Sequence, residues 1–203
     1  MSVQLITGFS GKPHVKAEDD RSLIAAIFGE GKYVLKRGNR LDYEIVSNNL
    51  IRIKNGDAVN QGAHIRIEEN DYEEVIIDNG SQGFKRIDLI VLRYEKDYET
   101  KVESASIVVI KGTESNNPVV PEYEKGNLYD GDIIDDMPLY KINIEGINII
   151  SVDRMFNYVV TMDDIFDIYK SLFNKGPLFI ENPKSDYNKL NTDQKVMNVN
   201  EEY

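Results

Sequence analysis

The sequence predicts a mostly β protein: an antiparallel sandwich or partly open barrel with one short N-terminal helix, followed by a C-terminal helix and an extended tail. The first observation is the run from Ile87 to Leu92, in which apolar residues occupy both odd and even positions, as in a strand buried on both faces. A similar run from Ser106 to Gly112 is interpreted as its antiparallel neighbour at the centre of one sheet. Short strand patterns then recur between turn residues, which is typical of sandwiches and barrels.

The two apolar runs are expected to supply the centre of the core. Turn residues precede the first run at Asn79-Gly80 and Gly83, and the charged residues Glu95-Lys96-Asp97 follow it, which favours a strand over a buried helix. Alternate aliphatic side chains of both runs are therefore predicted to be buried: Ile87, Leu89, Val91, Ile107 and Val109.

Composition excludes several classes of function. The 203 residues include 24 Lys and Arg against 35 Asp and Glu, for a net charge of -11. This balance argues against nucleic-acid binding, which relies on basic patches, and against docking onto anionic membranes. No stretch approaches the ~20 apolar residues of a membrane span, so we expect no membrane insertion. The absence of cysteine excludes disulfides, thiolate catalysis and Cys-ligated metals.

A short helix is predicted from Ala17 to Gly29, after a possible first strand from Val3 to Phe9. Asp19 or a neighbour can cap the helix, and the glycine can end it. We expect its apolar face to close the side or end of the sheet. That face consists of Leu23, Ile24, Ile27 and Phe28.

The middle of the chain is predicted to alternate between strands and turns. Asn55-Gly56 has the composition of a two-residue hairpin turn. Strands are expected from His64 to Ile67 and, separately, from Tyr72 to Ile77. Two further strands are expected from Pro138 to Glu145 and from Ile147 to Val152.

The pattern changes after Tyr158, so we expect a β domain over residues 1–158, an amphipathic helix over residues 159–175 and an extended polar tail over residues 176–203. Thr161 and Asp164 have the spacing of a capping box, with Asp in place of Glu. Apolar residues then follow at spacings of three and four, which places them on one stripe of the helix. The stripe comprises Met162, Ile165, Phe166, Tyr169, Leu172 and Phe173.

This apolar stripe is the candidate partner-binding surface. One interpretation is that the helix folds back onto its own sandwich, and the other is that it packs against partner subunits. In the second case the polar tail would lie extended across a neighbour, with Phe179, Tyr187, Leu190 and Met197 as spaced anchors.

The sequence offers no catalytic, cofactor-binding or metal-binding residue. His14 precedes the acids of a helix start, where the helix dipole favours negative charge. His64 lies in an alternating strand and is interpreted as solvent-facing or structural. Asp130-Gly131-Asp132 resembles part of a calcium loop but lacks a Glu at the twelfth position, which favours a solvated turn.

A set of short motifs resembles a family of small tail proteins of phages and prophages of Gram-positive hosts, with similar proteins in phage-tail-like bacteriocins. The resemblance extends over about Gly8 to Phe156 and excludes the helix and tail that follow. The motifs are Ile6-Thr7-Gly8, Pro13-His14-Val15, Asp19-Asp20-Arg21, Ile27-Phe28-Gly29, Asn55-Gly56-Asp57, Gln61-Gly62, Gly80 to Val91, Val109 to Thr113, Asp135 to Tyr140 and Ile144-Glu145-Gly146.

This resemblance implies a non-enzymatic structural subunit of a virion tail tip or baseplate, contractile or not, that connects the tail to fibres or receptor-binding proteins. The implied partners are other tail or baseplate subunits and further copies of the same chain in the particle. The resemblance supplies no catalytic residues. The alternative expectation is a carbohydrate- or receptor-binding module at the host surface. A tail-associated hydrolase is disfavoured because no activated pair of residues is visible.

Overall fold

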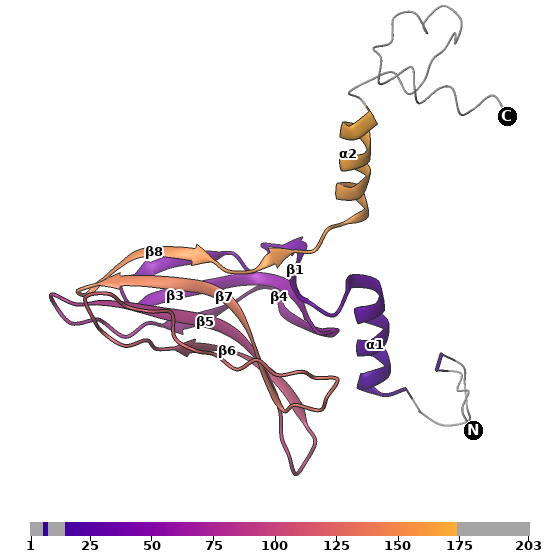
Figure 1. Cartoon of the computed structure of the whole chain (residues 1–203), viewed down its shortest axis with the longest axis horizontal. Coiled ribbons are helices and arrows are strands. Elements are labelled where there is room, and N and C mark those ends of the chain that lie inside the picture. The colour runs from indigo at the N-terminus through magenta and orange to yellow at the C-terminus, as the bar shows by residue number, and fades with distance from the viewer. Residues whose placement is uncertain (1–5, 8–14, 174–203) are drawn as a thin grey trace, which may run out of the picture. The chain divides into compact units, whose positions relative to one another are not determined.

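The computed structural model describes residues 6–7 and 15–173. In this part the chain is mostly β, with two sheets packed around a hydrophobic core and two short helices, which confirms the fold class predicted from the sequence (Figure 1). The chain divides into two compact units, Met1–Val159 and Val160–Tyr203. Both sheets belong to the first unit, and the helix α2 (Met162–Phe173) belongs to the second.

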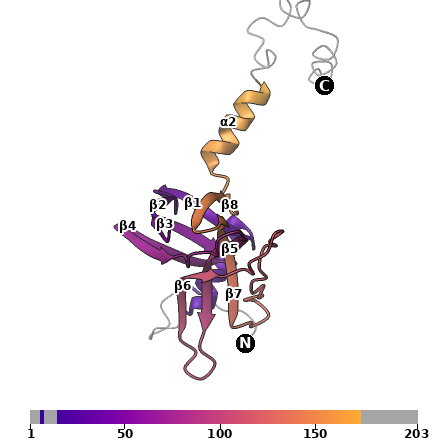
Figure 2. The same cartoon turned by 90° about the vertical axis from the view of Figure 1, so that its left-hand side faces the viewer.

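The first sheet is organised around its long strand β3. β4 pairs along almost all of β3, β2 and β1 pair with successive parts of β3, and β9 adds to β1. The pairing of β9 with β1 is parallel, and the others are antiparallel. Figure 2 shows β4 at one edge of this sheet. The strands are β1 (Lys32–Gly38), β2 (Tyr43–Ser47), β3 (Leu50–Asn60), β4 (Ala63–Ile76) and β9 (Asn157–Tyr158).

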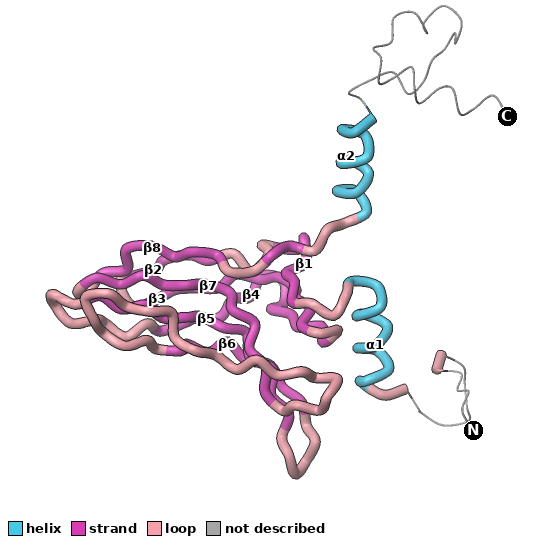
Figure 3. Tube along the Cα trace, viewed as in Figure 1, coloured by secondary structure: helices cyan, strands magenta, loops and turns pink. Residues whose placement is uncertain are grey.

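The second sheet has the order β6-β5-β7-β8, with all pairs antiparallel. The predicted pairing of the two apolar runs is confirmed, since Leu89 of β5 lies opposite Ile110 of β6. A long connection over residues 111–133 separates β6 from β7 and runs mostly as loop (Figure 3). The strands are β5 (Lys85–Lys96), β6 (Glu103–Ile110), β7 (Ile134–Glu145) and β8 (Asn148–Arg154).

The core lies between the two sheets and draws aliphatic side chains from both. Tyr140 adds an aromatic group to it: its ring makes edge-on contacts with Tyr43 and Phe156, at centroid distances of 5.0 and 5.7 Å. Such pairs stabilise a core beyond the area that they bury. The buried aliphatic residues of this core include Val34, Ile51, Ile53, Ile77, Ile90, Leu92, Leu139, Ile142 and Ile144.

The predicted core is confirmed for Leu89 and Val91 of β5 and is wrong for Ile87 of β5 and for both β6 residues. Leu89 and Val91 are fully buried, as expected. Ile87, Ile107 and Val109 are only half-buried. For the two β6 residues the reason is topological: β6 lies at the edge of its sheet, not at its centre, so it has a strand neighbour on one side only.

The hairpin predicted at Asn55-Gly56 is wrong, because these residues lie inside β3 at a shift of register. A Cβ on Gly56 would lie 2.5 Å from the backbone nitrogen of Leu41, so a close backbone approach explains this glycine. The chain turns instead at Gln61 and Gly62, whose φ angles are 47° and 83°. The two separate strands predicted beyond this turn form one continuous strand, β4, in which Asn70 has a positive φ.

The N-terminal helix α1 (Ala17–Phe28) begins and ends as predicted. The backbone N–H of Lys16 donates to the carboxylate of Asp19 at 2.9 Å, and Gly29 follows the last turn with a φ of 89°. The first strand predicted before this helix falls largely on residues outside the described ranges.

The predicted packing face of α1 is wrong. Leu23 and Ile27 are 58% and 67% exposed, and Phe28 is also exposed. The backbone contact with the β3–β4 turn sets a different face against the sheets, since a Cβ on Gly62 would lie 2.2 Å from the carbonyl oxygen of Arg21. Ala25, four residues after Arg21, is buried, and the guanidinium of Arg21 forms an ion pair with the Glu103 carboxylate of β6. Of the predicted face, only Ile24 is half-buried.

Candidate functional site

The predicted capping box at the start of α2 is confirmed. The hydroxyl and backbone N–H of Thr161 donate to the Asp164 carboxylate at 2.7 and 2.8 Å. In return, the Asp164 N–H donates to the Thr161 hydroxyl at 3.2 Å. These reciprocal bonds satisfy backbone groups that have no partner inside the helix, so α2 has a well-defined first turn.

The predicted stripe of α2 is exposed in the structure. Met162 and Leu172 are 78% and 65% exposed, and Ile168, which the sequence analysis omitted, extends the stripe. Phe173 is the last residue of the helix. The candidate anchors Phe179, Tyr187, Leu190 and Met197 lie outside the described residues. The other exposed residues of the stripe are Ile165, Phe166 and Tyr169.

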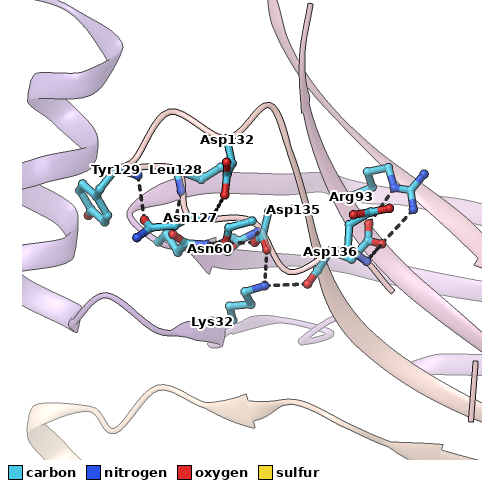
Figure 4. A network of polar contacts seen from close by, with 12 residues as sticks. Lys32, Asn60, Arg93, Asn127, Leu128, Tyr129, Asp132, Asp135 and Asp136 are labelled. Carbon is cyan, nitrogen blue, oxygen red and sulfur yellow. Dashed lines mark hydrogen bonds and ion pairs between the residues drawn. The ribbon is translucent and has the colours of Figure 1, made fainter. Parts of the chain in front are cut away.

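A buried polar network, which the sequence analysis did not find, surrounds Asp135 at the start of β7 (Figure 4). One carboxylate oxygen of Asp135 accepts from Lys32 Nζ at 2.7 Å. The other oxygen accepts from the side-chain amides of Asn60 at 2.8 Å and Gln61 at 3.1 Å. Asp135 has no exposed surface, so these donors compensate a carboxylate that would otherwise be costly to bury.

The adjacent Asp136 is equally buried and has a separate partner. Arg93 of β5 donates to both of its carboxylate oxygens, at 2.7 and 2.8 Å, and forms a bidentate ion pair. The backbone N–H of Glu124 donates to the same carboxylate at 3.0 Å. The side-chain interaction with Asp136 raises the pKa of Arg93, against a smaller opposing effect of burial.

Together these bonds fix the 111–133 connection against the ends of β1 and β3. The Gln61 amide donates to the Gly126 carbonyl at 2.8 Å, and its oxygen accepts from the Leu128 N–H at 3.0 Å. Lys32 also donates to the Asp136 carbonyl at 2.7 Å. The two neighbouring aspartates therefore hold a loop in place, and their charges are compensated within the fold.

A shallow hollow of about 360 Å³ opens beside this network. Its volume lies within the roughly 300–1,000 Å³ of small-ligand sites. Its lining residues are Glu30, Gly31, Lys32, Gln61, Gly126, Asn127 and Tyr129. Among these residues, Tyr129 is 48% exposed.

The acids of the Asp130-Gly131-Asp132 turn are engaged by hydrogen bonds within the turn. The backbone N–H of Asn127 donates to Asp132 at 2.7 Å, and its side-chain amide donates to Asp130 at the same distance. In the part of the chain that the structure describes, no group of three or more His, Cys, Asp or Glu side chains is placed to hold a metal ion.

We therefore predict that folding is independent of divalent metals. Thermal unfolding of the protein with a chelator and with added calcium should give the same midpoint, because the turn acids lack the ligand number that calcium requires. A rise of several degrees with calcium would contradict the prediction, and Asp130→Asn would then show whether this turn is responsible.

Of the two histidines, only His64 lies in the part of the chain that the structure describes, and it belongs to a cluster of polar contacts on β3 and β4. His14 lies outside the described residues. His64 Nε2 lies 2.7 Å from Asp57 Oδ1, and Arg66 Nε donates to the same oxygen at 2.7 Å. Burial works to raise the pKa of Asp57, but the hydrogen bonds from Arg66 and His64 outweigh it and lower that pKa. This cluster joins β3 to β4, which agrees with the structural role expected for His64.

A second buried ion pair, also missed by the sequence analysis, joins Arg86 and Asp88 on β5. Arg86 Nε and Nη2 donate to the two carboxylate oxygens of Asp88 at 2.8 and 2.9 Å, and both side chains are 1% exposed. Arg86 also donates to the carbonyls of Asp78 and Asn79, in the β4–β5 connection. The sequence does contain a signal for this pair. Two opposite charges lie two residues apart at the start of the apolar run, and this spacing places them on the same face of a strand.

Comparison with known proteins finds no matching family model and no matching curated protein. Within residues 15–173, neither helix is long and apolar enough to cross a membrane.

Proposed function

We propose that this protein is a non-enzymatic structural subunit of a phage tail or phage-tail-like particle, at the tail tip or baseplate, and that α2 joins it to other subunits. The exposed stripe of α2 is the observation that carries this proposal. An amphipathic helix of three to four turns is marginal alone in water, so it gains stability by packing its apolar stripe against a surface. The ordered motifs from Gly8 to Phe156 support the placement in a tail.

The polar chemistry of the first unit is consistent with a structural role. Asp135, Asp136 and Asp88 are fully buried, and each is matched by a cation that also reaches a neighbouring strand or loop. A catalytic carboxylate needs access to a substrate. These three carboxylates instead hold connections in place.

Ile165→Asp should weaken assembly, because it places a charge in the middle of the stripe that the proposal buries between subunits. The mass of the 203-residue protein in solution, measured by light scattering over a range of concentrations, should shift toward the monomer in this variant. Ser171→Asp adds the same charge to the opposite side of α2 and serves as the matched control, for which no shift is expected.

Hydrogen exchange supplies a second measurement for the same proposal. The amides from Ile165 to Leu172 should gain protection when isolated protein assembles, since ordering of the helix is coupled to binding. The proposal would be overturned if these amides were fully protected in the monomer and assembly did not change that protection. Such a result would mean that the stripe of α2 already packs against its own chain.

A further inference from the structure

We propose that the hollow beside Tyr129 binds a neutral saccharide unit. The inference concerns a different surface from α2 and does not depend on the proposed assembly role. It rests on an uncovered aromatic ring and on unpaired groups of both hydrogen-bonding types in the same hollow. It rests also on the hydrogen bonds of Figure 4, which hold Lys32 and the backbone of Tyr129.

The ring of Tyr129 is available for stacking. It is 48% exposed, and among the described residues no aromatic ring or cation packs on it. Its backbone is nevertheless fixed, because the Tyr129 N–H donates to the Asn127 side-chain oxygen at 3.0 Å. Tyrosine combines a large apolar face with a polar hydroxyl at low cost in conformational entropy. It therefore suits a ligand with an apolar C–H face and polar edges, such as a sugar ring.

The polar groups of the hollow fit a ligand that both donates and accepts hydrogen bonds. The Glu30 carboxylate has no hydrogen-bond or ion-pair partner among the described residues and can accept. Lys32 Nζ uses two of its three N–H groups, toward Asp135 and the Asp136 carbonyl, and keeps one donor. Hydroxyl groups donate and accept at once, so adjacent hydroxyls can satisfy both side chains.

The charges favour a neutral ligand over an anionic or apolar one. Glu30 and Lys32 carry opposite charges, so the hollow has no excess of cations with which to hold an anion, and the chain as a whole carries -11. An apolar ligand would remove water from these two groups without replacing its hydrogen bonds, which is costly.

The site is also preorganised. Lys32 is fixed by its hydrogen bond to Asp135, and the loop that carries Tyr129 is fixed by the Gln61 bonds to Gly126 and Leu128. Groups that are already held in place lose little freedom when a ligand binds, so more of the interaction energy remains as affinity.

The test is binding of the 203-residue protein to an array of neutral and acidic oligosaccharides, with affinities for the neutral hits measured by calorimetry. Tyr129→Ala should weaken binding by about tenfold, which corresponds to about 1.4 kcal/mol, and Glu30→Gln should weaken it because a carboxylate acceptor is lost. Tyr129→Phe keeps the ring and should retain most of the affinity. Tyr98→Ala removes an exposed tyrosine from the β5–β6 turn and should change nothing.

Three results would overturn the inference: no neutral oligosaccharide binds, only acidic ones bind, or Tyr129→Ala binds as well as the unmodified protein. Thermal midpoints of all variants should agree, since Tyr129 and Glu30 are exposed. The solution mass of Tyr129→Ala should equal that of the unmodified protein, so failure of saccharide binding and failure of α2-mediated assembly give separate readouts.

Discussion

Arg86→Met should lower the free energy of unfolding by about 3–5 kcal/mol, the range found when one partner of a buried ion pair is removed. The substitution leaves the Asp88 carboxylate, 1% exposed, without its bidentate partner. It also removes the donors that Arg86 provides to the carbonyls of Asp78 and Asn79. Methionine keeps much of the side-chain volume. The loss of stability therefore reflects mainly the missing ion pair and hydrogen bonds of Arg86, and only to a small extent the cost of a cavity. Urea unfolding followed by circular dichroism gives the value.

Two further variants separate the buried pair from charge in general. Lys111→Met removes a cation from an exposed ion pair with Asp78, and we expect no measurable change, because solvent screens that pair. Arg86→Met combined with Asp88→Leu should recover part of the lost stability, since an apolar pair can replace a buried ion pair. Recovery should be incomplete, because Asp88 also accepts from the Gly112 N–H at 2.9 Å. A loss below about 1 kcal/mol for Arg86→Met alone would mean that water reaches Asp88 in solution.

Local patterns predicted the parts of the fold that depend on local physics. The runs around Leu89 and Val109 are apolar enough to identify paired strands, and the spacing of Thr161 and Asp164 identifies a helix start, because both signals arise from residues close in sequence. Local patterns fail at Asn55-Gly56, where they predict a hairpin that does not form. Gly56 is explained by the close approach of the backbone of residues 40–41, which leaves no room for a Cβ. A two-residue turn pattern cannot reveal such a contact.

The candidate sites also differ in whether local sequence patterns can predict them. The stripe of α2 follows from helical periodicity and could be found from the sequence. The network at Asp135 could not, because it joins Asp135 of β7 to Lys32 and Asn60 of the first sheet, which lie 103 and 75 residues away from it along the chain. Each of these residues is of a polar or charged type that is usually found at the surface. Only the topology brings them together, and with them the hollow beside Tyr129.

Leu89→Ala should lower the free energy of unfolding by about 2–5 kcal/mol, as large-to-small substitutions in packed cores do. Leu89 is fully buried in β5, which pairs with β6 on one side and β7 on the other, so the surrounding backbone has little freedom to close the resulting cavity. Val119→Ala, at a position 74% exposed in the 111–133 connection, is the control and should change stability by no more than about 0.5 kcal/mol. Denaturant titrations of both variants test the expectation. A loss for Leu89→Ala no larger than that of the control would show that the centre of the second sheet is not tightly packed.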